Sequence, residues 1–360
     1  MPAAAPRVLI VRLGAMGDIL HALPSVAAIR SLLPESQIGW AVERRWRELL
    51  CAPDAELSGA RGAGRPLVDT LHLADTRTWR KKLLAGQTRR EFANFCRVLR
   101  EGHYDAVLDL QGAIKSAVVA RIAGVSAVIG FSHPREGVAA ALYHTTVSTS
   151  AANVIEQNAE MVQSWLRGAG CTGESALPSG ASLLPRHTAS ELRVESLLHS
   201  FGFVGAPFAI LTPGAGWAAK QWPAERYGEL AGRLARRGMR SVVNYGPGEA
   251  ALADDVAAAS RGAAVALCSS ISELVALTRR ASLFVGGDTG PMHLAALLGT
   301  KTLALFGPTD PARNGPYWPG TRSLRDAASV TNYSHRRTED AGLHSLCIER
   351  VIEEVSALLD

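Results

Sequence analysis

Two glycine turns of this chain hold side chains whose types and spacing could do chemistry. In the second half, Gly286-Gly287-Asp288-Thr289-Gly290 closes the apolar run 282–285 and opens a helical run at 294–298. A strand that ends in glycine and continues as a helix presents unpaired N–H groups and a positive dipole end, which bind phosphate or a developing anion. Asp288 and His293 would face that ligand. The alternatives are a helix-capping role for Asp288 and a core position for His293.

A similar turn lies near the N-terminus. Gly14-Ala15-Met16-Gly17-Asp18 links the apolar run 7–13 to a helical pattern at 19–33. Its glycines are three apart, and no acidic residue follows a second strand as the G-x-G-x-x-G dinucleotide fingerprint requires. Nicotinamide binding is therefore disfavoured. Asp18 is either a helix N-cap or a carboxylate that acts on a ligand.

Two further turns of the second half carry charged residues at expected helix starts. Lys220 ends the turn 213–220 and precedes a helix with Pro223 near its first position. A cation there opposes the helix dipole, so a bound phosphate explains Lys220 better than a structural role does. Glu249 follows the next strand and could accept hydrogen bonds from ribose hydroxyls. An acid in the first turn of a helix is also favourable without a ligand.

Composition indicates two α/β domains in a reducing compartment. The 360 residues are 47% hydrophobic, with 34 Gly and 18 Pro, which suits two globular domains of about 150 to 180 residues. The five cysteines are scattered without a C-x-x-C pair, which argues against a disulfide framework and a structural zinc site. No run of 18 apolar residues and no signal peptide is apparent. We expect a cytoplasmic protein.

The positive charge is concentrated in one segment. Residues 77–100 contain eight Lys or Arg residues and one acid, Glu91. Such a segment could bind nucleic acid, anionic lipid or a multiply charged small substrate. A solvated helix face explains Arg89 to Arg100. Trp79, set among four cations, predicts a loop that grips a ligand.

Apolar runs and helical patterns alternate through both halves, which predicts parallel sheets with right-handed crossovers. We expect two doubly wound, Rossmann-like domains facing across a cleft, with ligands at the carboxyl ends of the strands. The first domain is expected at residues 1–170, a Gly, Ser and Pro-rich linker at 171–186, and the second domain at 187–330. Residues 331–360 form a tail whose final helix is expected to pack back on the first domain. The expected strands are 7–13, 37–43, 68–73, 104–110, 127–131, 207–212, 240–245, 263–268, 282–286 and 301–306.

The motifs around these turns resemble the lipopolysaccharide heptosyltransferase family, glycosyltransferase family 9, over nearly the whole chain. The resemblance is carried by Val8–Arg12 with Met16-Gly17-Asp18, His21–Pro24, Pro213-Gly214-Ala215 with Lys220–Pro223, Gly246–Glu249, Asp288–Ala296 and Phe306–Pro311. The first half is more similar to type I than to type II members, through Trp40–Glu43, the cluster at 77–81, Asp109–Ser116 and Arg135-Glu136.

The resemblance implies an inverting, metal-independent glycosyltransferase of the GT-B type without a cofactor. Type I members transfer heptose from ADP-heptose to a Kdo sugar of the lipid A precursor. A single in-line displacement needs one base and support for the departing diphosphate. Asp18 is the expected base, and Lys220 with the amides of Thr289 and Gly290 meets the diphosphate.

The remaining site residues follow the same resemblance. The donor is expected to contact Glu249 through the ribose, Asp288 through the sugar, and His293 and Gly216 near the phosphates. The acceptor is expected to contact Gly17, Arg77, Arg80, Lys81, Lys115 and Arg135. The implied partners are the ADP-sugar, the Kdo-lipid A acceptor and the cytoplasmic leaflet of the inner membrane, with the enzyme a monomer that binds no nucleic acid.

Departures from the family pattern keep alternatives open. Gly216–Ala219 lacks the hydroxyl residues that some type I members place near the phosphates, and Arg77-Thr78 replaces a pair of arginines. Residues 321–344 match no pattern. The alternatives are a type II-like enzyme, another nucleotide-sugar transferase or an epimerase of the same fold. A nucleic-acid-binding protein is disfavoured, because the basic excess comes from one segment and not from a continuous groove.

Overall fold

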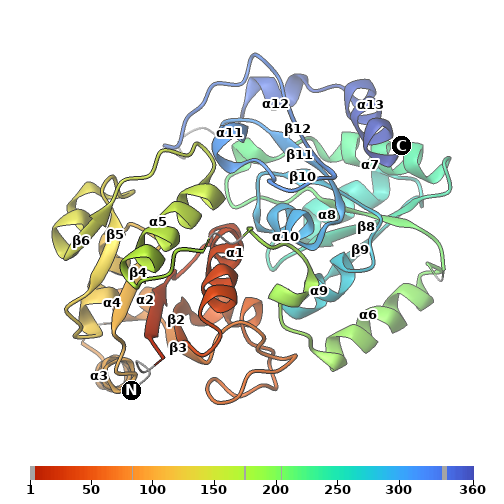
Figure 1. The fold of residues 1–360 in the computed structure, drawn as a ribbon. Coiled ribbons are helices and arrows are strands. Elements are labelled where there is room, and N and C mark those ends of the chain that lie inside the picture. The colour runs from red at the N-terminus through yellow and green to blue at the C-terminus, as the bar shows by residue number, and fades with distance from the viewer. Residues whose placement is uncertain (1–4, 83, 174–175, 204, 335–338) are drawn as a thin grey trace. The chain divides into compact units, whose positions relative to one another are not determined.

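The chain folds into two six-stranded parallel sheets, as the alternation of apolar runs and helical patterns predicts (Figure 1). The computed structural model describes residues 5–82, 84–173, 176–203, 205–334 and 339–360. The chain divides into two compact units, one of residues 1–178 and 182–187, the other of residues 179–181 and 188–360. The expectation of two doubly wound α/β domains is confirmed.

The first unit has the strand order β3-β2-β1-β4-β5-β6. Its strands are β1 (Arg7–Val11), β2 (Gln37–Glu43), β3 (Thr70–Ala74), β4 (Ala106–Asp109), β5 (Val128–Phe131) and β6 (Thr145–Val147). Its helices are α1 (Met16–Leu32), α2 (Thr76–Lys81), α3 (Gly86–Glu101), α4 (Ile114–Ile122) and α5 (Val154–Gly168), with short 3-10 helices η1 (Arg44–Leu49) and η2 (Gly137–Leu142). Helices α1 and α5 lie together on one face, and α3 and α4 lie on the other (Figure 1).

The second unit repeats this topology with the order β12-β11-β10-β7-β8-β9. Its strands are β7 (Phe208–Thr212), β8 (Arg240–Tyr245), β9 (Ala264–Cys268), β10 (Leu283–Gly287), β11 (Lys301–Phe306) and β12 (Thr321–Arg325). Its helices are α6 (Thr188–Ser200), η4 (Ala218–Lys220), α7 (Ala224–Ala235), α8 (Ala250–Ala259), α9 (Ile271–Thr278), α10 (Gly290–Leu298), α11 (Pro311–Asn314), α12 (Ala341–Ser345) and α13 (Ile348–Leu359).

Strand β7 explains how one apolar run serves two cores. Phe208 and Ile210 pack in a cluster with side chains of α6, α9 and α10, whereas Ala209 and Leu211 pack in a second cluster with side chains of α7, α8 and α13. Successive side chains of a strand point to opposite faces, so a strand buried on both faces is apolar throughout.

The segment between the domains contacts both units in turn. Gly180 donates its N–H to the Leu297 carbonyl of the second unit, at 2.7 Å. Arg186 donates its N–H to the Ala63 carbonyl of the first unit, at 2.8 Å. The second unit resumes at residue 188 and continues through the tail to residue 360.

The final helix is part of the second unit. We expected it to pack on the first domain, but α13 packs on α7, β11 and β12. Its apolar stripe, Ile348, Val351, Val355 and Leu358, is buried in the core of that unit. The indole N–H of Trp222 also donates to the Leu346 carbonyl, at 3.0 Å. The apolar stripe therefore finds its core within the second domain.

Several elements were not expected from the sequence, namely β6, β12, α2, α5, α6, α11 and α12. Strand β12 lies within 321–344, the segment that matched no pattern; residues 335–338 of that segment lie outside the described residues. Along β12 only Leu324 is buried, because the strand forms an edge of the sheet. None of the helices in the described ranges is long and apolar enough to cross a membrane.

Candidate active site

Each sheet reverses its strand order at one place, between β1 and β4 in the first unit and between β7 and β10 in the second. In open parallel sheets, ligands bind at the carboxyl ends of the strands beside such a reversal. Asp18 lies in the first turn of α1, which follows β1, and the turns after β7 and β10 carry Lys220 and Asp288. The fold therefore places these three expected site residues at the carboxyl edges of the two sheets.

Lys220, Asp288 and His293 form one cluster in the second unit. The Lys220 ammonium lies 2.6 Å from Asp288 Oδ2 and also donates to the Asp288 carbonyl, at 3.1 Å. His293 Nε2 lies 3.2 Å from Asp288 Oδ1. Burial raises the pKa of Asp288, but the hydrogen bond to His293 and the Lys220 ammonium outweigh burial and hold that pKa well below its usual range. The carboxylate is therefore ionised and held on both oxygens.

This cluster bears on three sequence interpretations. Asp288 does not cap α10, because Thr289 is the N-cap residue. His293 is buried, as a core histidine would be, but it also contacts Asp288. Lys220 ends η4 rather than starting α7, whose N-cap is Pro223. Its charge has a partner in Asp288, so a bound phosphate is not needed to explain it.

Gly287 permits the approach of the two turns. A Cβ atom at Gly287 would lie 2.7 Å from the Lys220 carbonyl oxygen, closer than side-chain carbons approach backbone oxygen. Glycine at the end of β10 therefore lets the backbone of Lys220 pass beside that strand. At the start of α10, Pro291 has no N–H and Met292 donates its N–H to the Thr289 carbonyl, at 3.1 Å, which leaves the amides of Thr289 and Gly290 at this end of the helix.

Glu249 lies beside the turn that follows β7. Its Oε2 accepts a hydrogen bond from the Gly246 N–H, at 2.9 Å, and Glu249 is the N-cap residue of α8. A Cβ atom at Gly214 would overlap the Glu249 carboxylate. The Glu249 carboxylate fits beside Gly214 because this residue has no side chain. Gly216, another expected donor residue, is exposed in the same turn.

In the first unit, Asp18 is held by two donors. Its Oδ1 lies 2.8 Å from Arg12 Nη2, and its Oδ2 accepts a hydrogen bond from the Ala15 N–H, at 3.0 Å. Ala15 is the N-cap of α1, so Asp18 is the third helical residue and not the cap. Burial raises the pKa of Asp18, but Arg12 and His21 outweigh it, and the pKa lies below its usual range. Neighbouring Gly17 is half-buried.

Sequence reasoning missed Arg12. The signal was present, because Arg12 is a cation that directly follows the apolar run Val8–Val11. In the structure Arg12 is only 6% exposed. A buried cation requires a partner. That partner is Asp18, together with the Leu110 carbonyl, to which Arg12 Nη1 donates.

The expected acceptor residues Arg77, Arg80 and Lys81 lie on α2, and all three are exposed. The expectation of a loop with a gripping tryptophan is wrong. Residues 76–81 form a helix, and Trp79 is buried, with its ring centroid 5.2 Å from that of Phe92 and 5.0 Å from that of Phe95. Trp79 anchors the helix and leaves the cations on its outer side.

Lys115 and Arg135 are also exposed, and the structure joins the turns that carry them. The Glu136 N–H donates to the Gly112 carbonyl, at 2.9 Å, and the Glu136 carboxylate accepts from the Ile114 N–H, at 2.8 Å. These turns follow β4 and β5 at the carboxyl edge of the first sheet.

Asp109, at the end of β4, organises the turn that carries Lys115. Its carboxylate accepts from Ser116 Oγ at 2.8 Å, Tyr143 OH at 2.9 Å and the Gln111 N–H at 2.9 Å. Burial raises the pKa of Asp109, because the side chain has no contact with solvent. Asp109 is therefore an internal anchor and does not face a ligand.

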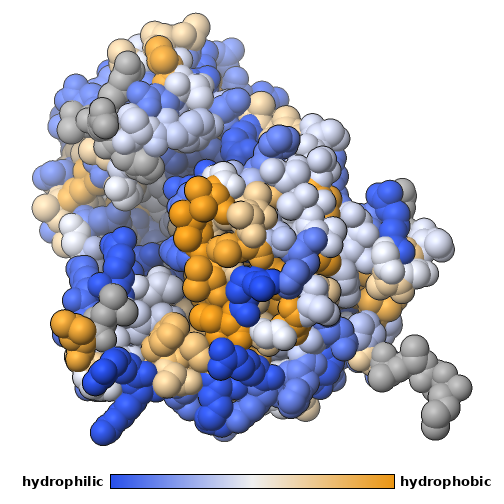
Figure 2. Space-filling view, turned by 90° about the vertical axis from the view of Figure 1, so that its left-hand side faces the viewer, coloured by the Kyte–Doolittle hydropathy of each residue, from blue (hydrophilic) through white to orange (hydrophobic). Residues whose placement is uncertain are grey.

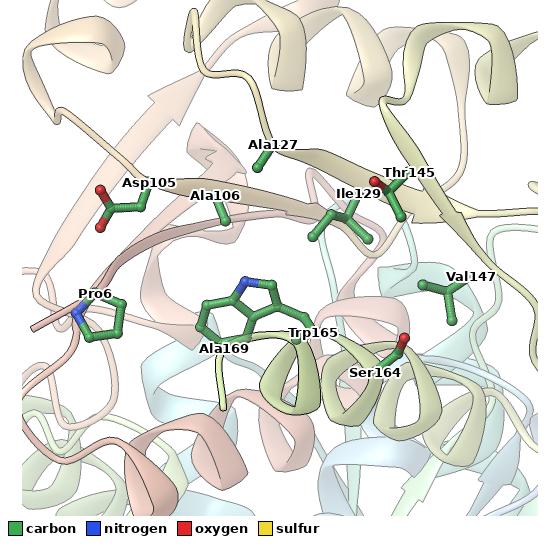
Figure 3. A pocket seen from close by; sticks show the side chains of 11 residues that line it. Pro6, Asp105, Ala106, Ala127, Ile129, Thr145, Val147, Ser164, Trp165 and Ala169 are labelled. Carbon is green, nitrogen blue, oxygen red and sulfur yellow. The ribbon is translucent and has the colours of Figure 1, made fainter. Parts of the chain in front are cut away.

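A cavity of about 390 Å³ in the first unit lies at a different edge (Figure 3). Its lining includes Pro6, Asp105 and Ala127, which precede β1, β4 and β5, and Trp165 of α5. Figure 3 shows the Trp165 ring beside Ala106. These residues mark the amino ends of the strands, opposite to the Asp18 turn. The described residues include no group of three or more His, Cys, Asp or Glu side chains placed to hold a metal ion.

Comparisons with known proteins identify the family of this chain. The family model of glycosyltransferase family 9 (heptosyltransferase) matches residues 92–341. Lipopolysaccharide heptosyltransferase 1 of Pseudomonas aeruginosa is 30% identical over 317 residues, 86% of this chain and 81% of that protein. Lipopolysaccharide heptosyltransferase 2 of Escherichia coli is 29% identical over 276 residues, 72% of this chain and 77% of that protein.

Solved structures share the fold. The E. coli heptosyltransferase WaaC with ADP superposes with a TM-score of 0.74 at 24% sequence identity, covering 98% of this chain and 99% of that chain. Together with the family match and the relatives, this leads to one conclusion: the chain belongs to glycosyltransferase family 9 (heptosyltransferase), and it is a glycosyltransferase.

Proposed function

We propose that this protein is a lipopolysaccharide heptosyltransferase of type I, which moves heptose from ADP-heptose to a Kdo sugar of the lipid A precursor. The observation that carries the proposal is the Lys220 ammonium at the carboxyl ends of β7 and β10, beside the N-terminus of α10. The identity of the substrates is supported by relatives named heptosyltransferase 1, at 27–30% identity over 86% of the chain.

The second unit is suited to a nucleotide-diphosphate leaving group. An ammonium has three donors, and Asp288 accepts from Lys220 at two positions, so one donor remains for a phosphate oxygen. The dipole of α10 and the amides of Thr289 and Gly290 add positive potential at the same edge. These groups would stabilise charge that grows on the diphosphate as the sugar leaves. Glu249 would bind the ribose.

The first unit supplies a base. The acceptor hydroxyl oxygen forms the new bond to the anomeric carbon, the bond from that carbon to the ADP oxygen breaks, and Asp18 takes the hydroxyl proton. A single displacement of this kind inverts the anomeric centre. In the proposed reaction, protein groups provide the charge stabilisation, and no metal ion or cofactor takes part.

The acceptor is proposed to approach from the cytoplasmic leaflet of the membrane. The exposed cations of α2 could pair with its carboxylates and phosphates, and anionic lipids attract each such cation by about 1 kcal/mol. Apolar side chains are also exposed in this unit, with Ile114 and Val118 on α4 and Val138 on η2. Figure 2 turns the side of α3 and α4 toward the viewer and shows hydrophobic residues gathered between hydrophilic ones.

A direct transfer assay tests this function. The purified protein, with EDTA and without added metal, should release ADP from ADP-heptose only when a Kdo-bearing lipid A precursor is present. Mass spectrometry should find one added heptose, and NMR of the product should find the inverted anomer. Loss of turnover in EDTA, or a product that retains the donor's anomeric configuration, would contradict the mechanism.

The main alternative is a type II enzyme, because a heptosyltransferase 2 is 29% identical over 72% of the chain. Type I and type II differ in the acceptor, so a parallel reaction with an acceptor that already carries one heptose separates them. Faster transfer to that acceptor would favour type II. An ADP-hexose donor tests the sugar, for which one hydroxymethyl group contributes about 1–3 kcal/mol of discrimination.

A further inference from the structure

Arg12 connects the turns that follow β1 and β4. It is 6% exposed and comes directly after the buried strand residues Val8–Val11. One terminal nitrogen, Nη1, donates to the Leu110 carbonyl at the end of β4, and the other, Nη2, lies 2.8 Å from Asp18 Oδ1. The planar guanidinium thus contacts two acceptors that are 92 residues apart in the sequence.

Asp18 is restrained on both oxygens and is still accessible. Oδ1 faces Arg12, and Oδ2 accepts from the Ala15 N–H at 3.0 Å. Each carboxylate oxygen can accept two hydrogen bonds, so one position on each oxygen is left for a hydroxyl group. The side chain of Asp18 is 34% exposed, which leaves an approach for that hydroxyl.

Two titratable groups of the first unit act on Asp18. Arg12 comes from the end of β1, and His21 comes from the next turn of α1. Burial raises the pKa of the carboxyl group, whereas both neighbours and the Ala15 N–H lower it, with Arg12 the largest of the lowering contributions. Without Arg12, burial would oppose ionisation with less compensation.

We propose that Arg12 is the positioning residue of the catalytic base: it fixes the Asp18 carboxylate against the turn after β4 and keeps it in the anionic form that takes the acceptor proton. This inference rests on the proposed function, since it concerns the base of that reaction. In this role Arg12 acts through Asp18 and not by its own contact with donor or acceptor.

Two substitutions separate charge from position. Arg12→Met removes both the positive charge and the contacts that hold Asp18 in position. The acid limb of the profile of kcat against pH should therefore move up by about 1–2 pH units. At neutral pH, kcat should fall about 10- to 100-fold with an unchanged KM for the donor. Arg12→Lys keeps the charge but loses the fork that reaches Leu110 and Asp18 together. Its acid limb should stay near that of the wild type while kcat falls.

Arg30 provides a matched control. Its side chain is 13% exposed, against 8% for Arg12, and its guanidinium makes an ion pair with Asp69 in the same unit, at 2.5 Å, at the opposite end of α1 from Asp18. Arg30→Met should lower the melting temperature but leave the position of the acid limb unchanged. If Arg30→Met and Arg12→Met shift the profile equally, the shift reflects general destabilisation and the proposal is overturned.

A double-mutant cycle tests whether Arg12 acts through Asp18. In an Asp18→Asn background, Arg12→Met should lower kcat by less than about threefold, because its route to the reaction is already gone. The same loss in both backgrounds overturns the proposal.

The charge effect can also be measured without any transfer. A carboxyl ¹³C NMR titration, with Asp18→Asn to assign the signal, should show the Asp18 pKa raised in Arg12→Met and little changed in Arg12→Lys. This readout keeps the two hypotheses apart, because it can succeed when the sugar or acceptor has been misidentified. An unmoved Asp18 signal in Arg12→Met, in a protein that remains folded, overturns the role of Arg12.

Discussion

The two carboxylate oxygens of Asp288 contact two different side chains, Lys220 Nζ at 2.6 Å and His293 Nε2 at 3.2 Å. Asp288 is 7% exposed, so this arrangement compensates the burial of its charge. It also means that Asp288 can serve in two ways, as a ligand of the donor sugar or as the residue that holds Lys220. In the proposed reaction, both functions place it beside the diphosphate of the donor.

Asp288→Ala distinguishes these two functions. If Asp288 binds the sugar, the variant should weaken ADP-heptose binding by at least about tenfold, a loss of roughly 1.4 kcal/mol. Free ADP should bind nearly as well as before, because Lys220 loses its neutralising partner and keeps its charge. Calorimetric titration of both ligands measures the difference. Equal losses for ADP and ADP-heptose would show that Asp288 only holds Lys220 in place.

Most strands of both sheets could be predicted from the sequence, because each of these is an apolar run that ends in a turn. Ten strands were expected at nearly the right places. The edge strands β6 and β12 were missed because their residues are mostly polar, so the sequence shows neither an apolar run nor an alternation there. Helix α2 was missed because six residues with three cations carry little helical periodicity.

The partners of the site residues could not be read from the sequence. Lys220 and Asp288 are 68 residues apart, and they meet only because β7 pairs with β10. The pairing of Arg12 with Leu110 likewise depends on β1 lying beside β4. Alternation predicts parallel strands but not their order, so it cannot say which turns become neighbours. The residue types were predictable, and their ion pairs were not.

Asp18→Asn tests the proposed base. The amide oxygen can still accept from the Ala15 N–H, so the start of α1 should remain folded. Turnover should fall by about 100-fold or more, because general-base contributions are typically 10² to 10⁴, while ADP-heptose affinity stays nearly unchanged. Single-turnover rates and donor titration measure the two quantities. A fully active Asn variant would remove Asp18 from the reaction.

Replacing Arg77, Arg80 and Lys81 together by Ala tests the acceptor site. The triple variant should raise the acceptor KM strongly and reduce binding to anionic vesicles, with donor affinity intact. A matched triple variant of Arg89, Arg90 and Arg97 on α3 removes the same charge from an adjacent helix. It should weaken vesicle binding but leave the KM for a detergent-dispersed acceptor unchanged. An unchanged acceptor KM in the α2 variant at low salt would show that these cations are only a solvated helix face and do not bind the acceptor.

The buried His72 should make the stability of the first unit sensitive to acid. It is buried on β3, with Nε2 2.7 Å from the Tyr104 hydroxyl, and burial lowers its pKa to about 4. An unfolded histidine titrates near 6.5, so between about pH 6.5 and 4 the unfolded state binds a proton that the folded state does not. Stability should therefore fall by up to about 3 kcal/mol across that window as the pH is lowered.

His72→Gln should flatten this dependence, because glutamine can hydrogen-bond Tyr104 but cannot be protonated. Hydrogen exchange of peptides from the first unit, followed from pH 7 to 4.5 and corrected for intrinsic rates, reports on this unit separately from the second. The same pH slope in both proteins would mean that another group causes the loss of stability.

Gly214→Ala tests the place of Glu249. A methyl group at residue 214 would overlap the Glu249 carboxylate, which must then leave its position at the Gly246 N–H. If that carboxylate binds the ribose, ADP affinity should fall by about tenfold, which corresponds to the loss of one hydrogen bond to a charged group. Glu249→Gln should cause a loss of similar size, and the two changes combined should cost little more than either alone, because both act on one contact.

Gly232→Ala on α7 is the control, since a Cβ atom there meets no neighbour within 4 Å. Additive losses in the double variant would show that Gly214 affects the donor by another route, and normal ADP binding in Glu249→Gln would remove the ribose contact from the donor site.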